Sequence, residues 1–228
     1  MITLFTTTED KNLAYHVTQD FSSVDSARKN LAIKYNFEID NLHYMEQIHS
    51  NSVKNISSTT NCQTCDALIT NKPNTPLLVM VADCIPILFY DDLLEVIGVA
   101  HAGRAGTFEN ISANTIKKMC VDYKCAIENI KVILGPSIQK CCYEVSQEMA
   151  DFVENKFGIE FVNKRNIDLQ GINKKQLLDL GIEEKNIEIS TVCTKCSNQP
   201  YFSYRNDNSC GRFAGLIMIE KKNSNTTL

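Results

Sequence analysis

Continuous apolar runs along the chain predict buried strands. Residues 77–82 are all apolar and end at Asp83, and the runs 85–90 and 95–100 flank a turn at Asp91-Asp92. Short apolar runs bounded by turn residues are typical of strands that are covered on both faces. Strands are also predicted at 130–134, which is stopped by Gly135-Pro136, and at 187–192 and 216–220.

Other segments repeat their apolar residues at helical spacing. Residues 23–35 fit one helical face, and Ser23 can cap the first turn of this helix. Helices are also predicted at 110–121, 145–156 and 174–180. The last two end just before Gly158 and Gly181, since glycine commonly follows the final helical residue.

The order of these elements indicates the fold class. Strands and helices do not alternate regularly, so the chain is predicted to be α+β rather than a repeated βαβ structure. No linker, repeat or low-complexity tract divides it, which predicts a single domain over residues 1–228. The polar tail 221–228 is expected to be disordered.

Composition and charge narrow the class of protein. The 228 residues carry a formal charge of −4, which gives no electrostatic case for nucleic acid or an anionic membrane as partner. The start of the chain lacks the features of a signal peptide, and no apolar run is long enough to span a bilayer. These features predict a cytoplasmic protein whose ten cysteines stay reduced. Its four histidines are too few for several copper centres.

Three residues stand out as candidate metal ligands. Cys84 and His101 each follow a predicted buried strand, and His49 lies in a polar loop. Two imidazoles and one thiolate can hold Zn²⁺ and leave a fourth position open for water or substrate. Burial of Cys84 and His101 as ordinary core residues is an equally good interpretation of this spacing.

Two Cys-x-x-Cys pairs suggest a different kind of metal site. Cys62 with Cys65 and Cys193 with Cys196 could together form a closed four-thiolate zinc site. The spacing within each pair suits zinc, but the pairs lie far apart in the sequence, so their association has little support.

Several motifs occur in an order that resembles a known family. They are QIHSNSV at 47–53, CDALIT at 65–70, ADCIPIL at 82–88, GVAHAG at 98–103, LGPSI at 134–138, CCYEV at 141–145, FSYR at 202–205 and GR at 211–212. Together they resemble the YfiH-like family of polyphenol oxidase or laccase domain proteins, which includes purine nucleoside phosphorylases. The resemblance covers nearly the whole chain.

The resemblance implies a fold, a site and an activity. The implied fold is a layered α+β sandwich of mixed sheets flanked by helices, in a group that includes a Cys-His toxin deamidase. His49, Cys84 and His101 would be the zinc-binding, catalytic residues. The implied reaction is phosphorolysis of adenosine, inosine, guanosine and methylthioadenosine, with adenosine deamination as a second activity.

Arginines near the motifs are candidates for binding phosphate. Arg28, Arg104 and Arg205 are expected to take this role, because guanidinium groups bind phosphate in a bidentate manner. Asp83 is expected to orient a metal ligand or carry a proton, although an acid at a strand end can equally be a structural cap. Thr8-Glu9-Asp10, Arg104-Ala105 and Asn206 depart from the usual family residues.

The sequence leaves three other functions open. Cys84 and His101 could act without metal as the nucleophile and base of a thiol hydrolase or deamidase. Alternatively, the chain could be a non-enzymatic structural-metal or redox-sensing module. Cu²⁺ could enter the three-ligand site, so a copper-dependent polyphenol oxidase is a further possibility. The expected partners are a nucleoside and phosphate, and the sequence does not specify the oligomeric state.

Overall fold

A six-stranded mixed sheet forms the centre of the molecule. The computed structural model describes residues 1–56 and 61–220. The strand order is β12-β9-β7-β8-β5-β3. These strands are β3 (Val53–Asn55), β5 (Ala67–Thr70), β7 (Ile85–Asp91), β8 (Val96–Ala102), β9 (Ile130–Leu134) and β12 (Ile187–Ile189). β7 pairs antiparallel with both β8 and β9, while β12 runs parallel to β9 and β3 runs parallel to β5.

A smaller antiparallel sheet packs on one face of this central sheet. Its strand order is β1-β13-β6, with β1 (Ile2–Phe5), β6 (Leu77–Val81) and β13 (Phe213–Met218). Leu88 and Val99 of the central sheet share one buried cluster with Val79 and Phe213 of the smaller sheet. Two short pairs complete the strands: β2 (Tyr44–Glu46) with β4 (Cys62–Thr64), and β10 (Val162–Asn163) with β11 (Asn166–Ile167).

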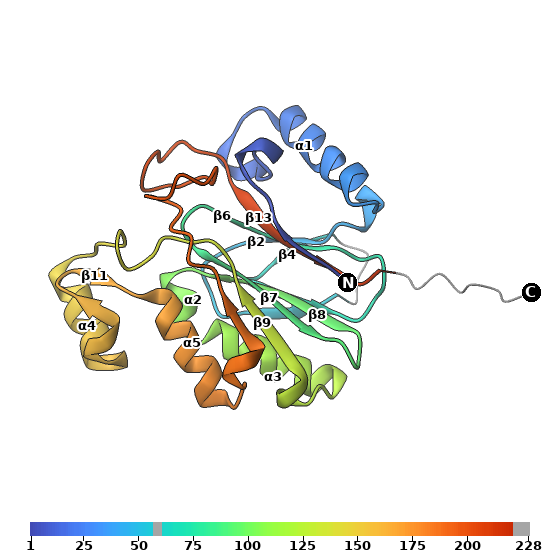
Figure 1. Ribbon diagram of the computed structural model, residues 1–228. Helices are drawn as coiled ribbons and strands as arrows, with labels where there is room; N and C mark the ends of the chain where they lie inside the picture. Colours follow the sequence, from blue (N-terminus) through green and yellow to red (C-terminus); the bar gives the residue numbers. More distant parts are fainter. Residues whose placement is uncertain (57–60, 221–228) are drawn as a thin grey trace, which may run out of the picture.

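Helices cover the outer faces of both sheets (Figure 1). α1 (Phe21–Lys34) packs its Leu31 against Met80 and Leu216 of the smaller sheet. α2 (Arg104–Phe108), α3 (Ile111–Tyr123) and α5 (Leu169–Leu180) cover the other face of the central sheet, with α4 (Gln147–Phe157) beside β11. Short 3₁₀ helices lie at Thr8–Asp10, Tyr15–Val17, Ile39–Asn41, Ile127–Asn129, Ile159–Phe161 and Glu184–Asn186. The layers confirm the predicted α+β sandwich of mixed sheets flanked by helices.

Most of the expected elements are present, with shifted ends. The strand predicted at 130–134 has those bounds, whereas α1 begins earlier than expected because Asp20, not Ser23, accepts the capping hydrogen bond. α5 begins at Leu169 instead of residue 174, since the Asp168 side chain caps it by accepting from the Gly171 amide. Side-chain caps outside the apolar stripe therefore decided where these helices start.

The short and edge strands were not expected. β1, β2, β4, β10 and β11 have two to four residues each. Segments of this length carry too few alternations to be distinguished from loops. The prediction for the tail 221–228 lies outside the described residues. Within the described ranges, no helix is both long and apolar enough to cross a membrane.

Candidate functional site

Three predicted ligands come together where the two sheets meet. The chain passes from β6 of the smaller sheet to β7 of the central sheet through Cys84, while His101 lies within β8, the neighbour of β7. His49 comes from the loop between β2 and β3. The possible donor atoms of these three residues all lie within 4.8 Å of one another. Antiparallel pairing of β7 with β8 thus places residues that are distant in sequence at one site.

A buried carboxylate organises this group. Asp66, fully buried at the start of the β5 segment, accepts the backbone N–H groups of Ile48, His49 and Ser50. The Ser50 hydroxyl also donates to it, at 2.7 Å. His101 Nδ1 lies 2.9 Å from Asp66 Oδ1, so the other ring nitrogen is the one available towards Cys84. One carboxylate therefore holds both the loop that carries His49 and the ring of His101.

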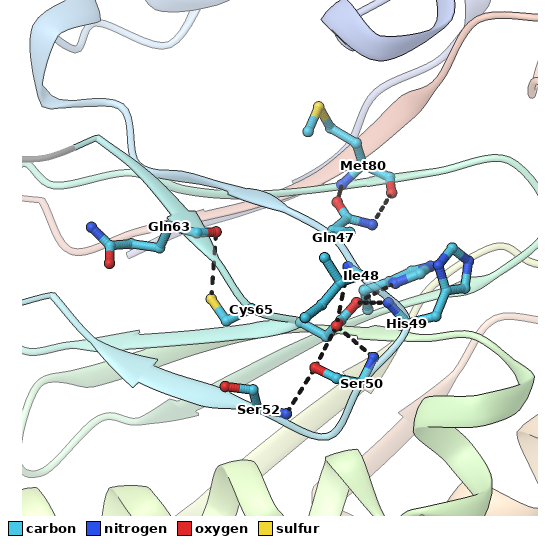
Figure 2. A network of polar contacts seen from close by, with 10 residues as sticks. Gln47, Ile48, His49, Ser50, Ser52, Gln63, Cys65 and Met80 are labelled. Carbon is cyan, nitrogen blue, oxygen red and sulfur yellow. Dashed lines mark hydrogen bonds and ion pairs between the residues drawn. The ribbon is translucent and has the colours of Figure 1, made fainter.

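The loop is held in an unusual backbone conformation. His49 has φ = 60°, and Asp83, next to Cys84, has φ = 85°. Non-glycine residues adopt such angles at a cost, and they persist where surrounding contacts hold them. Two hydrogen bonds between the Gln47 amide and the Met80 backbone, at 2.7 and 2.9 Å, also fasten the loop to β6 (Figure 2).

The electrostatics favour a thiolate beside an imidazolium when no metal is bound. Burial alone would raise the pKa of Cys84, but His101 and His49 outweigh this effect and lower that pKa to about 6. Burial alone would lower the pKa of His101, but the Cys84 thiolate and the Asp66 carboxylate raise it to about 9. Near neutral pH, the Cys84–His101 pair therefore carries opposite charges.

The donor set fits a divalent transition metal ion. A thiolate and two imidazoles are ligands that zinc prefers, and copper also binds such sites strongly. Gly103 allows the backbone to approach all three: an added Cβ would lie 3.1 Å from Cys84 Sγ and 3.4 Å from His49 Cδ2. The hydrogen bond from His101 to Asp66 is the usual support of a metal-bound imidazole.

A pocket of about 500 Å³ opens beside the three ligands. This volume suits a small-molecule ligand. Besides the ligands, its walls include His16, Tyr204 and Arg212. Arg212 Nη1 donates to the carbonyls of Cys210 and Gly211, which fixes the guanidinium at the pocket wall.

Asp83 does not share the position of the ligands. Its carboxylate accepts from Thr194 Oγ1 at 2.7 Å and from the Arg205 backbone N–H at 2.8 Å. Both oxygens are thus engaged by the segment 194–205, and Asp83 is absent from the groups of clustered metal donors among the described residues. This geometry favours the structural alternative, in which Asp83 holds the neighbouring segment.

The predicted arginines divide into two classes. Arg28 is buried, donates from Nε and Nη2 to the Leu13 carbonyl, and lies 4.4 and 4.0 Å from the ring centroids of Tyr15 and Tyr44. It lines a separate hollow of about 140 Å³, so its expected role in binding phosphate is not supported by its position. The two hydrogen bonds to one carbonyl explain how Arg28 can be buried. They give its charged guanidinium a partner where α1 packs on the smaller sheet.

Arg104 and Arg205 both lie near Tyr143. Arg205 lies 4.9 Å from the ring centroid of Tyr143, and its Nη1 donates to the Glu144 carbonyl. Burial, and next the Cys84 charge, raise the pKa of Tyr143, while Arg104 and Arg205 oppose them. Both cations therefore act on Tyr143, and neither is among the residues lining the 500 Å³ pocket.

Two important side chains, Asp66 and Arg212, were not predicted from the sequence. Asp66 directly precedes the apolar residues 67–69 of β5, and an isolated acid beside an apolar run was the available signal. Arg212 was noted only as part of a motif. Its place in the pocket depends on β13 returning the end of the chain to β6, which no local pattern indicates.

The two Cys-x-x-Cys pairs do not come together among the described residues, in agreement with the little support that their distance in the sequence gave to such a site. Cys193 and Cys196 do cluster with two further thiols, but these are Cys141 and Cys142 rather than Cys62 and Cys65. The ten cysteines are all free thiols.

Comparisons with known proteins give a consistent assignment. A family model described as multi-copper polyphenol oxidoreductase laccase matches residues 6–220. A Clostridium acetobutylicum protein named purine nucleoside phosphorylase is 32% identical over 94% of this chain and 91% of its own length. A Corynebacterium glutamicum protein with the same name is 35% identical over 92% and 87%, respectively. The crystal structure of Bacillus licheniformis hypothetical protein YfiH has a TM-score of 0.87 at 25% identity, covering 96% of this chain and 92% of that one.

Proposed function

The chain belongs to the multi-copper polyphenol oxidoreductase laccase family, and on this premise we propose that it is a metal-dependent purine nucleoside phosphorylase. The observation that carries the proposal is the convergence of His49, Cys84 and His101 at the wall of a 500 Å³ pocket that also presents Arg212. The names of the relatives supply the reaction class. Residues 1–228 would form one catalytic domain.

Zinc is the metal that we propose for this site. His49, Cys84 and His101 would hold it, and a Zn²⁺ ion bound by three protein ligands supplies a Lewis acid with an open position. Cys84 is suited to this role because its pKa of about 6 makes it a thiolate near neutral pH. Asp66 holds His101 in the required orientation. The four histidines of the sequence cannot furnish several copper centres, so the family's descriptive name does not define the reaction.

The remaining pocket residues would bind the two substrates. In phosphorolysis, a phosphate oxygen forms a bond to ribose C1′ while the bond from C1′ to the purine nitrogen breaks, and the purine takes up a proton. Arg212 would bind the phosphate, since its guanidinium is fixed at the pocket wall. Burial and the neighbouring cations lower the pKa of His16, so its neutral ring can exchange a proton or a hydrogen bond with the substrate. Tyr204 offers an aromatic face to the purine.

A thiol hydrolase or deamidase is the second candidate function. The specific observation in its favour is the alignment of Cys84, His101 and Asp66, which resembles a nucleophile, base and orienting acid. This reaction would need no metal. Metal content together with activity separates the two candidates.

The decisive experiment measures bound metal and phosphate-dependent release of adenine from adenosine. We expect the wild-type protein to contain zinc and to release adenine and ribose 1-phosphate only with phosphate present. Cys84→Ala should lose this activity. The control Cys120→Ala should keep it, because Cys120 lies on α3 and belongs to neither group of clustered metal donors. Equal activity in wild type and Cys84→Ala would overturn the proposal.

Two other outcomes assign a different reaction. Conversion of adenosine to inosine without phosphate would identify the adenosine deaminase activity instead. A metal-free, fully active protein that is inactivated by alkylation of Cys84 would identify the thiol enzyme. Inosine, guanosine and methylthioadenosine extend the same assay to the other expected nucleosides, and added copper tests for oxidase activity.

A further inference from the structure

We propose that Cys141, Cys142, Cys193 and Cys196 form a second metal site, a closed four-thiolate zinc site that fastens two loops beside the catalytic pocket. The four cysteines constitute a separate group from His49, Cys84 and His101. This proposal does not depend on the reaction proposed above.

The positions of the sulfur atoms match a tetrahedral ion. All four Sγ atoms lie within 4.8 Å of one another, and Cys141 Sγ lies 3.7 Å from Cys196 Sγ. A tetrahedral zinc with Zn–S bonds of roughly 2.3 Å separates its sulfurs by roughly 3.8 Å. The observed spacing is thus close to one edge of the tetrahedron and too long for a disulfide bond.

Two tight turns present these sulfurs. Cys193 and Cys196 flank a turn in which the Ser197 N–H donates to the Cys193 carbonyl at 3.0 Å. The backbone amides of Gln139, Cys196 and Lys195 hydrogen-bond to the Cys193 sulfur. Amides directed at a sulfur stabilise it as a thiolate, which is the form that binds metal. The Cys193-x-x-Cys196 spacing is that of many structural zinc sites.

The other two sulfurs come from adjacent residues in a second turn. The Cys142 N–H donates to the Gln139 carbonyl at 2.9 Å, so the chain reverses at Cys141 and Cys142. The two turns are joined through the backbone, since Ser137 forms a β-bridge with Cys193. Four thiols that converge from two loops resemble a ligand set more than core filling, because Cys141 and Cys196 are exposed.

The chemistry of the set favours a single zinc ion. Thiolates select zinc, copper(I) and iron–sulfur clusters. A cluster with several iron atoms holds its ligand sulfurs farther apart than the 4.8 Å limit seen here. Four tetrahedral thiolates close the coordination shell of zinc, so the ion would have a structural role.

The site connects directly to the catalytic pocket. Thr194, between the two thiols of its turn, donates to the Asp83 carboxylate at 2.7 Å, and Asp83 precedes Cys84. The chain continues from Cys142 into Tyr143, the ring under Arg205. Zinc at the four thiolates would therefore order the segments that support Cys84 from behind. Cys141, Cys193 and Cys196 also line a cavity of about 590 Å³, together with Gln170.

Metal counting tests the proposal on the full-length chain. We expect reduced wild-type protein to hold two zinc ions per chain and Cys141→Ser/Cys196→Ser to hold one. The matched control Cys62→Ser/Cys120→Ser, with half-buried thiols outside both groups, should hold two. Cys84→Ala should hold one, retained at the four-thiolate site. The proposal is overturned if Cys141→Ser/Cys196→Ser keeps the wild-type zinc count.

The same counts separate this proposal from the proposed function. If the histidine-containing site binds no zinc, wild type will hold one ion, Cys84→Ala will also hold one, and Cys141→Ser/Cys196→Ser will hold none. A third outcome would reject the metal site. In it, wild type and the control double variant contain a Cys141–Cys196 disulfide, and Cys141→Ser/Cys196→Ser holds as much zinc as they do. The thiols would then form a redox pair.

A spectroscopic measurement on a conservative variant tests ligation by Cys196 without removing a metal donor. Cobalt(II) in place of zinc should give Cys84→Ala an intense thiolate-to-metal charge-transfer band, because four sulfurs would then ligate the only ion. Cys196→His keeps a zinc donor, so we expect it to retain the zinc count while this band weakens in the Cys84→Ala background. An unchanged band in Cys84→Ala/Cys196→His would contradict ligation by Cys196.

Discussion

At the scale of single residues, Asp66 links the loop of His49 to the ring of His101. Its carboxylate accepts three backbone amides, one hydroxyl and one imidazole nitrogen. These bonds, led by the one from His101, outweigh burial and lower the pKa of Asp66. The carboxylate therefore stays charged while fully buried, as a support for a metal-bound histidine requires.

Asp66→Asn should weaken zinc binding at the proposed site of His49, Cys84 and His101 by about 10- to 100-fold. The amide has one accepting oxygen instead of two, so either His101 or the loop loses its partner. Competition with a chromogenic chelator measures the affinity. Asp91→Asn, a buried acid at the far end of β7, is the control and should leave the affinity unchanged. An affinity of Asp66→Asn within twofold of wild type would refute this role.

The Cys84–His101 pair predicts a pH profile for the metal-free protein. Because the pKa of Cys84 is lowered to about 6, its thiolate is populated above about pH 6 and is lost as the pH falls below that value. Iodoacetamide should therefore alkylate Cys84 with a midpoint near pH 6, against roughly 8.5 for an ordinary thiol. His101→Ala should move the midpoint upward. Peptide mass spectrometry reads the rate at each pH, and a midpoint that His101→Ala leaves in place would contradict the pairing.

At the scale of elements, the position of Arg28 on α1 makes it a packing residue rather than a phosphate ligand. Arg28 lies on the buried face of the helix, where two tyrosine rings and one carbonyl surround its guanidinium. Arg212, in contrast, enters the pocket from the segment before β13. The two arginines therefore differ in the element that carries them and in what they face.

Arg28→Lys should lower the free energy of unfolding by about 1–3 kcal/mol, because a single ammonium cannot replace two bonds and the stacked plane. Its KM for phosphate should stay within twofold of wild type. Arg212→Lys should have the opposite effects. It should raise the KM for phosphate by roughly tenfold, which corresponds to a loss of about 1.4 kcal/mol of binding free energy, and it should change the free energy of unfolding little. Urea unfolding and initial rates measure the two effects. A large rise in the phosphate KM of Arg28→Lys alone would restore Arg28 as a phosphate ligand.

At the scale of the whole molecule, both groups of metal donors lie where loops cross the ends of strands. The central sheet, its partner sheet and the covering helices form continuous buried clusters. The core therefore does not need a metal to bury its apolar surface. Metal would stabilise the loops above it by binding the folded state only.

Removal of zinc with a chelator should lower the melting temperature by roughly 5–10 °C and leave the far-ultraviolet circular dichroism unchanged. Added zinc should restore the melting temperature, and magnesium, which prefers oxygen ligands, should not. Calorimetry and circular dichroism on one sample provide both readings. An apoprotein that has lost its secondary structure would show that the fold itself depends on metal.

Apolar patterning determined much of the architecture from the sequence. The runs at 77–82 and 85–90 became β6 and β7 because a buried strand needs apolar residues on both faces, and the segment 130–134 became β9 although its Lys131 is exposed. The trio His49, Cys84 and His101 was also named from the sequence, through motifs and strand ends. Short strands such as β1 and β10 were missed, since pairing rather than pattern creates them.

Only the tertiary structure decided which distant side chains meet. The sequence alone named the three candidate ligands and the α+β class, and its four histidines are too few for several full copper centres. Strand pairing then placed Asp66 against His101, Arg28 against tyrosine rings, and Cys141 beside Cys196. The local sequence pattern determines the periodicity of apolar residues and the positions of turns. Contacts between residues distant in sequence depend instead on the register of β5, β7 and β8 and on loop closure. That is the physical reason why chemistry could be proposed from the sequence but its supporting contacts could not.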